Sequence, residues 1–117
     1  MIIMMKKTQL IFQDNVINGY NHYRRFKNDF SDALAIFKKY ILPIECDIAL
    51  DANHDWLIFF IDHEDEELAE YEFDSIVDFL KSNKMPPSYP SIYDDWSMIV
   101  PIDYFVEYVL SMSIIEP

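Results

Sequence analysis

Glycine and cysteine are nearly missing from this 117-residue chain, which has one of each. Loops that bind a phosphate group need glycine, because their backbone must approach the anion closely. With Gly19 as the single glycine, the sequence excludes the P-loop and dinucleotide-binding fingerprints. With Cys46 as the single cysteine, no disulfide can form within the chain, which fits a reducing compartment.

Long apolar runs are absent as well. No stretch approaches the ~20 apolar residues that a membrane helix needs, and even residues 56–61, WLIFFI, have only the length of a strand. The first seven residues, MIIMMKK, place apolar side chains before basic ones, which is the reverse of a secretory signal. We therefore expect a cytoplasmic protein.

Basic residues are few and unevenly distributed. The chain has nine Lys and Arg against 21 Asp and Glu, so its formal net charge is −12. Residues 1–39 carry a net charge of +4, whereas residues 40–117 carry −16. A field of that sign repels nucleic acid and anionic lipid, and it attracts cationic proteins or metal ions. Direct binding of nucleic acid or of a membrane is therefore disfavoured.

Length and composition predict a single domain over residues 1–117. Hydrophobic residues make up 51% of the chain, and a chain of this length buries roughly two-thirds of its unfolded surface on folding. A core of that size needs neither a metal ion nor a disulfide for its stability. The apolar content also argues against disorder, despite the charge.

Apolar residues recur at helical spacing between residues 20 and 41, and Pro43 then ends the pattern. We predict one helix over 20–41, with its basic residues on the outside. Segment 8–17 gives no clear signal for one type of structure. The predicted apolar stripe consists of Tyr20, Tyr23, Phe26, Phe30, Leu34, Phe37 and Ile41.

Three strands are predicted after this helix, over residues 44–50, 56–62 and 67–73. The polar turn DANHD joins the first two in a hairpin. The continuously apolar second segment is typical of a central strand. Residues 96–100 predict a further short strand.

The third predicted strand alternates in polarity. Ala69, Tyr71 and Phe73 would lie on one face, and Glu70 and Glu72 on the other. This pattern predicts a sheet with one face in solvent and one face against helices.

Two helices complete the expected fold. A short helix is predicted over 74–83, and a final helix over 101–113, where Pro101 suits the first helical position. Its predicted inner face consists of Phe105, Val106, Val109 and Leu110. Together the elements predict an α+β domain, with an antiparallel meander of three or four strands packed against about three helices.

The histidines predict no catalytic or metal site. His22 lies in the basic helix. His54 and His63 lie at opposite ends of the 56–62 strand, about 20 Å apart, and should not share a metal ion. The acidic turn 62–67, DHEDEE, lacks the spaced pattern of a calcium loop, which leaves at most weak binding of a divalent ion.

Cys46 does not have the surroundings of a nucleophile. It lies between Glu45 and Asp47, whose negative charges raise the pKa of a thiol. The serines lack a nucleophile-elbow motif. We therefore predict a non-catalytic protein with no cofactor.

Two segments combine acidic and aromatic residues in a way that favours protein binding. The first is SIYDDW, residues 91–96, since tyrosine and tryptophan give large contact areas and dominate binding hot spots. Contact with the core is the better interpretation for Trp96, whereas Tyr89 and Tyr93 suit either role. The second is the charged segment 62–72. Nine contact residues are predicted: Asp62, Glu64, Asp65, Glu66, Glu70, Glu72, Tyr93, Asp94 and Asp95.

In its size, its acidity, its lone Cys46 and its stretches YDDW and EYEF, the chain resembles small acidic immunity proteins. These proteins neutralise bacterial nuclease toxins, including those of contact-dependent growth inhibition systems. The resemblance implies a toxin inhibitor that acts by protein–protein interaction. Its partner would be a cognate cationic toxin domain, a nuclease, whose active site or substrate-binding surface it covers.

The alternative is a nucleic-acid mimic that inhibits a DNA-processing enzyme, such as a phage inhibitor of restriction or CRISPR enzymes. The carboxylates of a mimic should be spread at phosphate-like intervals along one elongated face. In the predicted fold they gather in a turn, a strand and a loop instead. This distribution favours the immunity interpretation.

Overall fold

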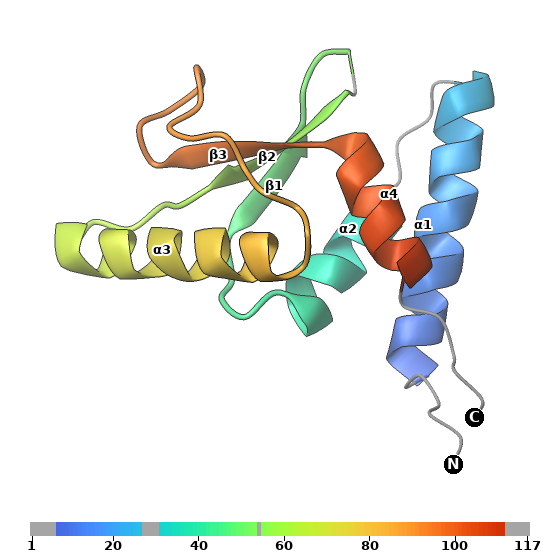
Figure 1. Ribbon diagram of the computed structural model, residues 1–117, viewed down its shortest axis with the longest axis horizontal. Coiled ribbons are helices and arrows are strands. Elements are labelled where there is room, and N and C mark those ends of the chain that lie inside the picture. The colour runs from blue at the N-terminus through green and yellow to red at the C-terminus, as the bar shows by residue number, and fades with distance from the viewer. Residues whose placement is uncertain (1–6, 27–30, 54, 112–117) are drawn as a thin grey trace.

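The computed structural model describes residues 7–26, 31–53 and 55–111 of the chain. It contains both helices and an antiparallel sheet, which confirms the predicted α+β class. In chain order the elements are α1 (Lys7–Phe26), α2 (Ser31–Ile36), the π-helical segment η1 (Phe37–Ile41), β1 (Asp47–Leu50), β2 (Trp56–Phe60), α3 (Glu66–Ser82), β3 (Ser97–Pro101) and α4 (Ile102–Ser111), as Figure 1 shows.

The three strands form an antiparallel sheet in the order β1-β2-β3. A tight turn joins β1 to β2, where the Asp51 carboxylate accepts hydrogen bonds from the backbone N–H groups of Asp55 at 2.7 Å and Trp56 at 2.9 Å. The connection from β2 to β3 is long and contains α3. The hairpin predicted for the first two strands is therefore confirmed. The short strand predicted at 96–100 is β3.

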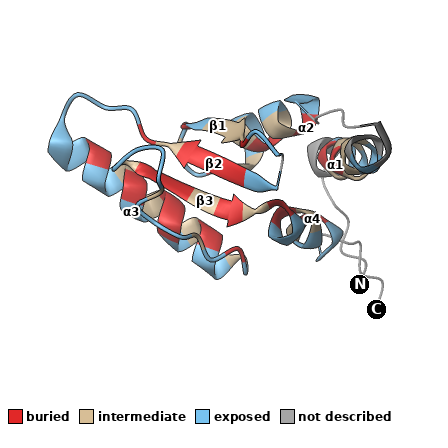
Figure 2. Cartoon of the chain, turned by 90° about the horizontal axis from the view of Figure 1, so that it is seen from above, coloured by how far each residue is buried: buried red, intermediate tan, exposed pale blue. Residues whose placement is uncertain are grey.

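Alternate residues of the strands lie on opposite faces of the sheet. On the inner face, Phe59 lies opposite Met98, and both belong to the core that the helices share. On the outer face, the register aligns Ala49, Ile58 and Ile99 in one row across the strands. No described helix covers this outer face. Figure 1 shows α3 on the other side of the sheet, and Figure 2 looks onto the uncovered side.

The core lies between the inner face of the sheet and the helices. The ring of Phe37 in η1 lies 4.9 Å from Phe105 of α4, 5.6 Å from Phe12 of α1 and 6.2 Å from Phe79 of α3. Phe37, Phe105 and Phe12 are fully buried. Ring pairs at such distances stabilise the fold beyond the burial of their area. One aromatic cluster therefore connects elements from both ends of the chain.

The strand predicted over 67–73 is wrong, because these residues belong to helix α3. Asp65 caps the helix: its carboxylate accepts hydrogen bonds from the backbone N–H groups of Glu67 at 2.9 Å and Leu68 at 3.2 Å. Tyr71, which strand alternation would bury, is 65% exposed. The residues form a helix because their helical spacing of buried apolar side chains continues into the segment 74–83, which the sequence predicts as a separate helix. The buried residues are Ala69, Phe73, Ile76, Val77 and Leu80.

The single helix predicted over 20–41 is also incorrect. Helix α1 begins at Lys7, so the ambiguous segment 8–17 is helical, and Phe12 and Val16 are its buried residues. Helices α1 and α2 are separate elements that pack against each other. Five residues discussed above have side chains that the structure does not describe. They are Tyr23, Phe26 and Phe30 of the predicted apolar stripe and the histidines His22 and His54.

The final helix, α4, follows β3 directly, and its predicted inner face is partly correct. Phe105 and Val109 are fully buried. Leu110, however, is 54% exposed, because the buried side of the helix is centred on Ile102, Phe105 and Val109. Among the residues that the structure describes, no helix combines the length and the apolar character needed to cross a membrane.

Candidate interaction site

The acidic turn after β2 and the loop before β3 lie side by side at one end of the sheet. The backbone N–H of Ile61 donates to the carbonyl of Trp96 at 2.9 Å, which extends the β2–β3 register by one pair. Asp62 and Asp95 follow this pair directly. The structure thus brings together two segments that the sequence presents as separate surfaces. We call the carboxylates of Asp62, Glu64, Asp65, Glu66, Asp94 and Asp95 the acidic end.

Aromatic contacts hold the loop before β3 against α3. The ring of Phe73 on α3 lies 5.8 Å from Trp96 and 5.4 Å from Tyr89, edge to face in both cases. The Lys81 ammonium lies 5.7 Å from the centre of the Tyr89 ring. The interpretation of Trp96 as a core anchor is therefore confirmed. Tyr89, which suited either role, contacts α3 and remains 45% exposed.

The tip of this loop presents two large side chains to solvent. Ile92 is 93% exposed and Tyr93 is 49% exposed. The tip is tied to β3, because Ser91 shares a hydrogen bond between hydroxyl groups with the fully buried Ser97. The Ser91 hydroxyl also accepts the backbone N–H of Tyr93 at 3.1 Å. Exposed side chains on such a fixed backbone suit contact with a partner.

Two of the nine predicted contact residues also have structural roles. Asp65 caps α3. The Asp94 carboxylate accepts the backbone N–H of Trp96 at 2.8 Å, and the Asp94 carbonyl accepts the Ser97 hydroxyl at 2.7 Å. Both residues remain exposed, so their charge also contributes to the surface.

The negative charge of the acidic end is not neutralised within the described part of the chain. Among the described residues, the structure shows one ion pair, between Lys38 of η1 and Asp47 of β1 at 3.1 Å, and neither residue belongs to the acidic end. Asp62, Glu64 and Asp95 are exposed and form no ion pair with a described residue. These carboxylates are available to a cationic partner.

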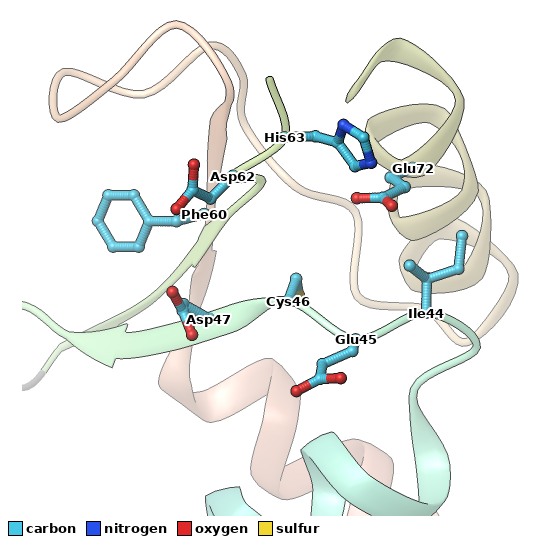
Figure 3. Close-up of a pocket in the computed structure, with 8 residues that line it drawn as sticks. All are labelled: Ile44, Glu45, Cys46, Asp47, Phe60, Asp62, His63 and Glu72. Carbon is cyan, nitrogen blue, oxygen red and sulfur yellow. The ribbon is translucent and has the colours of Figure 1, made fainter. Parts of the chain in front are cut away.

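Glu70 and Glu72 do not share the solvated face that the strand prediction gave them. They lie on α3, where residues two apart point in nearly opposite directions. Glu70 is exposed and follows Glu66 by one helical turn. Glu72 is half-buried and turns toward β1, where it lines a cavity near Cys46 (Figure 3).

This cavity of about 370 Å³ adjoins the acidic end through Asp62. Figure 3 shows His63 and Glu72 on the wall formed by α3 and the turn before it, with Cys46 between that wall and Asp47. Half of the lining residues are carboxylates, which extends the negative surface toward β1. The lining consists of Ile44, Glu45, Cys46, Asp47, Phe60, Asp62, His63 and Glu72.

Burial, more than the neighbouring charges of Asp47, Glu72 and Glu45, raises the pKa of the Cys46 thiol to about 12, against the opposing effect of Lys38. A thiol with such a pKa is protonated at neutral pH and is a weak nucleophile. The described side chains include no group of three or more His, Cys, Asp or Glu residues placed to hold a metal ion.

The sequence predicts a sheet with one face in solvent and one face against helices, but this prediction derives from residues 67–73, which are helical. The continuously apolar segment around β2 does not reveal which of its sides is uncovered. In the structure, the helices cover the inner side alone, and Trp56 at the start of β2 is 37% exposed. A signal was present in β1, where the charged Asp47 occupies the outer face opposite Phe60.

The comparisons with known proteins return no match: no family model, curated protein or solved structure is similar to this chain.

Proposed function

We propose that the chain is a cytoplasmic, non-catalytic immunity protein that binds a cationic nuclease toxin domain through its acidic end. The observation that carries the proposal is the meeting of two acidic segments at Asp62 and Asp95, without ion pairs to described residues. Carboxylates gathered on one surface without opposite charges repel one another and destabilise the compact state. An arrangement that lowers the stability of the free protein makes physical sense where a partner supplies the opposite charge.

The electrostatics suit fast capture of a basic protein. A concentrated field of one sign raises association rates by orders of magnitude and weakens with salt. The exposed Tyr93 and Ile92 beside the carboxylates add apolar contact area, as in the centre of many interfaces. A nuclease fits this description because it binds nucleic acid through Lys and Arg side chains.

The chemistry of Cys46 supports a role without catalysis. This thiol lies in the cavity beside the acidic end, but its raised pKa keeps it protonated. Inhibition would then come from occupation of the toxin's surface, with one chain bound to one toxin domain.

A second candidate, mimicry of nucleic acid, is favoured by one feature of α3. Four exposed carboxylates lie in a line along the helix: Glu66, Glu70, Asp74 and Asp78. Successive members are four residues apart, which places them about 6 Å apart along the helix axis. The gathering of acidic residues that argued against a mimic depended on a strand at 67–73, and that strand is a helix. Evenly spaced negative charge along a line is what a mimic presents to a DNA-processing enzyme.

Affinity capture distinguishes the two functions. Tagged wild-type chain is used to recover partners from its source cells at 50 mM and 150 mM NaCl, with mass spectrometry as the readout. An immunity protein recovers a small basic toxin domain in equal molar amount, and added DNA competes for it weakly. Recovery of a large DNA-processing enzyme that DNA displaces completely would favour mimicry. Recovery of no basic protein at either salt concentration would contradict both functions.

A further inference from the structure

The outer face of the sheet is apolar at its centre and does not belong to the core that the helices form. Ile58 is 3% exposed and is flanked across the strands by Ala49 and Ile99. Trp56 and Phe60 lie two residues to either side of Ile58 on the same face, since alternate residues share a face. None of these five side chains is among those packed against the helical core.

Negative charge borders this face at both ends. Asp47, which is ion-paired with Lys38, lies directly opposite Phe60 in the β1–β2 register. Asp62 and Asp95 follow one step beyond, at the acidic end. At the other end of β2, Asp55 is exposed in the hairpin turn. The strand positions of the outer face, in β1, β2 and β3, include no Lys or Arg.

The exposed tip of the loop before β3 continues the same surface. Its Ser91 is hydrogen-bonded to Ser97, which occupies the outer face opposite Phe60. In Figure 1 this loop, coloured orange, rises from the sheet on the side away from α3. Ile92 and Tyr93 are therefore placed at the edge of the outer face. An apolar centre with a charged rim is the usual composition of a protein interface.

The negative charge around the outer face indicates which kind of partner can bind there. A second copy of this chain, docked face to face, would bring its own Asp62 and Asp95, or Asp55, against the same residues. Like charges facing each other across an interface disfavour such a pair. A partner with an apolar centre and surrounding Lys and Arg side chains is complementary in both respects.

We propose that the outer face of the sheet, around the exposed Trp56 and the half-buried Ile99, is the docking surface for the basic partner. The acidic end then forms one side of the interface and steers the partner, while the apolar centre provides most of the lasting contact. This inference rests on the proposed function and assigns it a second contact area.

The test measures the dissociation constant of the captured basic protein, purified, against five forms of the chain by calorimetry at 150 mM NaCl. The face variants are Trp56→Ser and Ile99→Lys. Leu110→Ser is the matched control, since Leu110 is an exposed apolar residue on α4. Circular dichroism establishes that each variant is folded. We expect Trp56→Ser to weaken binding by about 30-fold or more, as for a hot-spot residue.

Ile99→Lys should weaken binding at least as much, because it places a positive charge against a positive partner. Leu110→Ser should bind like the wild type. If both face variants bind normally while Asp62→Asn with Asp95→Asn weakens binding, the outer face is not the docking surface, and the proposed function stands. If no basic protein is captured at all, the proposed function itself fails and the inference fails with it.

Sedimentation of the free wild-type chain at about 100 μM gives an independent result. A monomer agrees with the proposal. A dimer that Ile99→Lys dissociates would show that a second copy occupies the outer face, and would overturn the proposal.

Discussion

Repulsion between Asp62 and Asp95 should be measurable in the free protein. Asp62 lies just beyond the end of β2 and Asp95 in the turn before β3, each next to a member of the hydrogen-bonded pair Ile61 and Trp96. In water, two unit charges repel by roughly 1 kcal/mol at about 4 Å and by less at larger separations, and interactions between exposed charges are typically about 0.2–1 kcal/mol. We expect Asp62→Asn to raise the free energy of unfolding by about 0.5 kcal/mol at low salt.

A double-mutant cycle in urea isolates this effect, because urea is uncharged and does not screen. Asp95→Asn should stabilise by a similar amount, and the double variant should gain less than the two single gains combined, because either change removes the same repulsion. Asp14→Asn, on α1 at the other end of the molecule, is the control and should gain less.

Salt provides a second check on the same variants. At 1 M NaCl the screening length is about 3 Å, so the stabilising effect should disappear. The reasoning would be refuted if both substitutions destabilised the protein, or if their effects were additive and independent of salt.

Four further predictions concern residues whose roles the structure defines. Asp65→Ala should lower stability by about 1 kcal/mol through loss of the α3 cap, whereas Asp65→Asn should retain most of it, as measured by urea denaturation. Lys84 has a left-handed backbone with φ of 61° just after α3, so Lys84→Gly should raise stability by about 0.5–1 kcal/mol in the same assay, and a loss would contradict this. Phe37→Ala should cost about 3–5 kcal/mol by removing the centre of the aromatic cluster, seen as a large fall in thermal midpoint; a fall of a few degrees would be too small. Cys46, whose pKa is raised from 9.0 to about 12, should react with a disulfide reagent at pH 8 roughly a thousand-fold more slowly than free cysteine, and at the normal rate in urea. Because the folded-state pKa is the higher one, its contribution to stability is complete below pH 9 and is lost as the pH rises toward 12, relative to Cys46→Ala.

The sequence predicts the sheet well because its signals are local. The polar turn between two apolar runs places the β1–β2 hairpin, and Pro101 and Asp103 place the start of α4 within one residue. The error over 67–73 arises because Ala69 and Phe73 satisfy strand alternation and helical spacing equally. The decisive feature is Asp65, whose carboxylate caps the helix, with Glu66 and Glu67 in the first turn.

The candidate site is harder to predict because it depends on pairing between distant segments. The acidic turn and the loop around Asp95 each stand out in the sequence, but their contact follows from the register between β2 and β3. The position of the uncovered outer face depends on which side of β2 the helices pack against. An apolar strand such as WLIFF carries the same pattern whether one face or both are covered.

The most direct test of the central claim is to titrate the nuclease activity of the captured basic protein with this chain. The account predicts that activity falls linearly to zero at one chain per toxin. The variant Asp62→Asn with Asp95→Asn should inhibit more slowly at 50 mM NaCl. Nuclease activity that persists with the chain in excess, or inhibition that the two substitutions leave unchanged at low salt, would contradict the account.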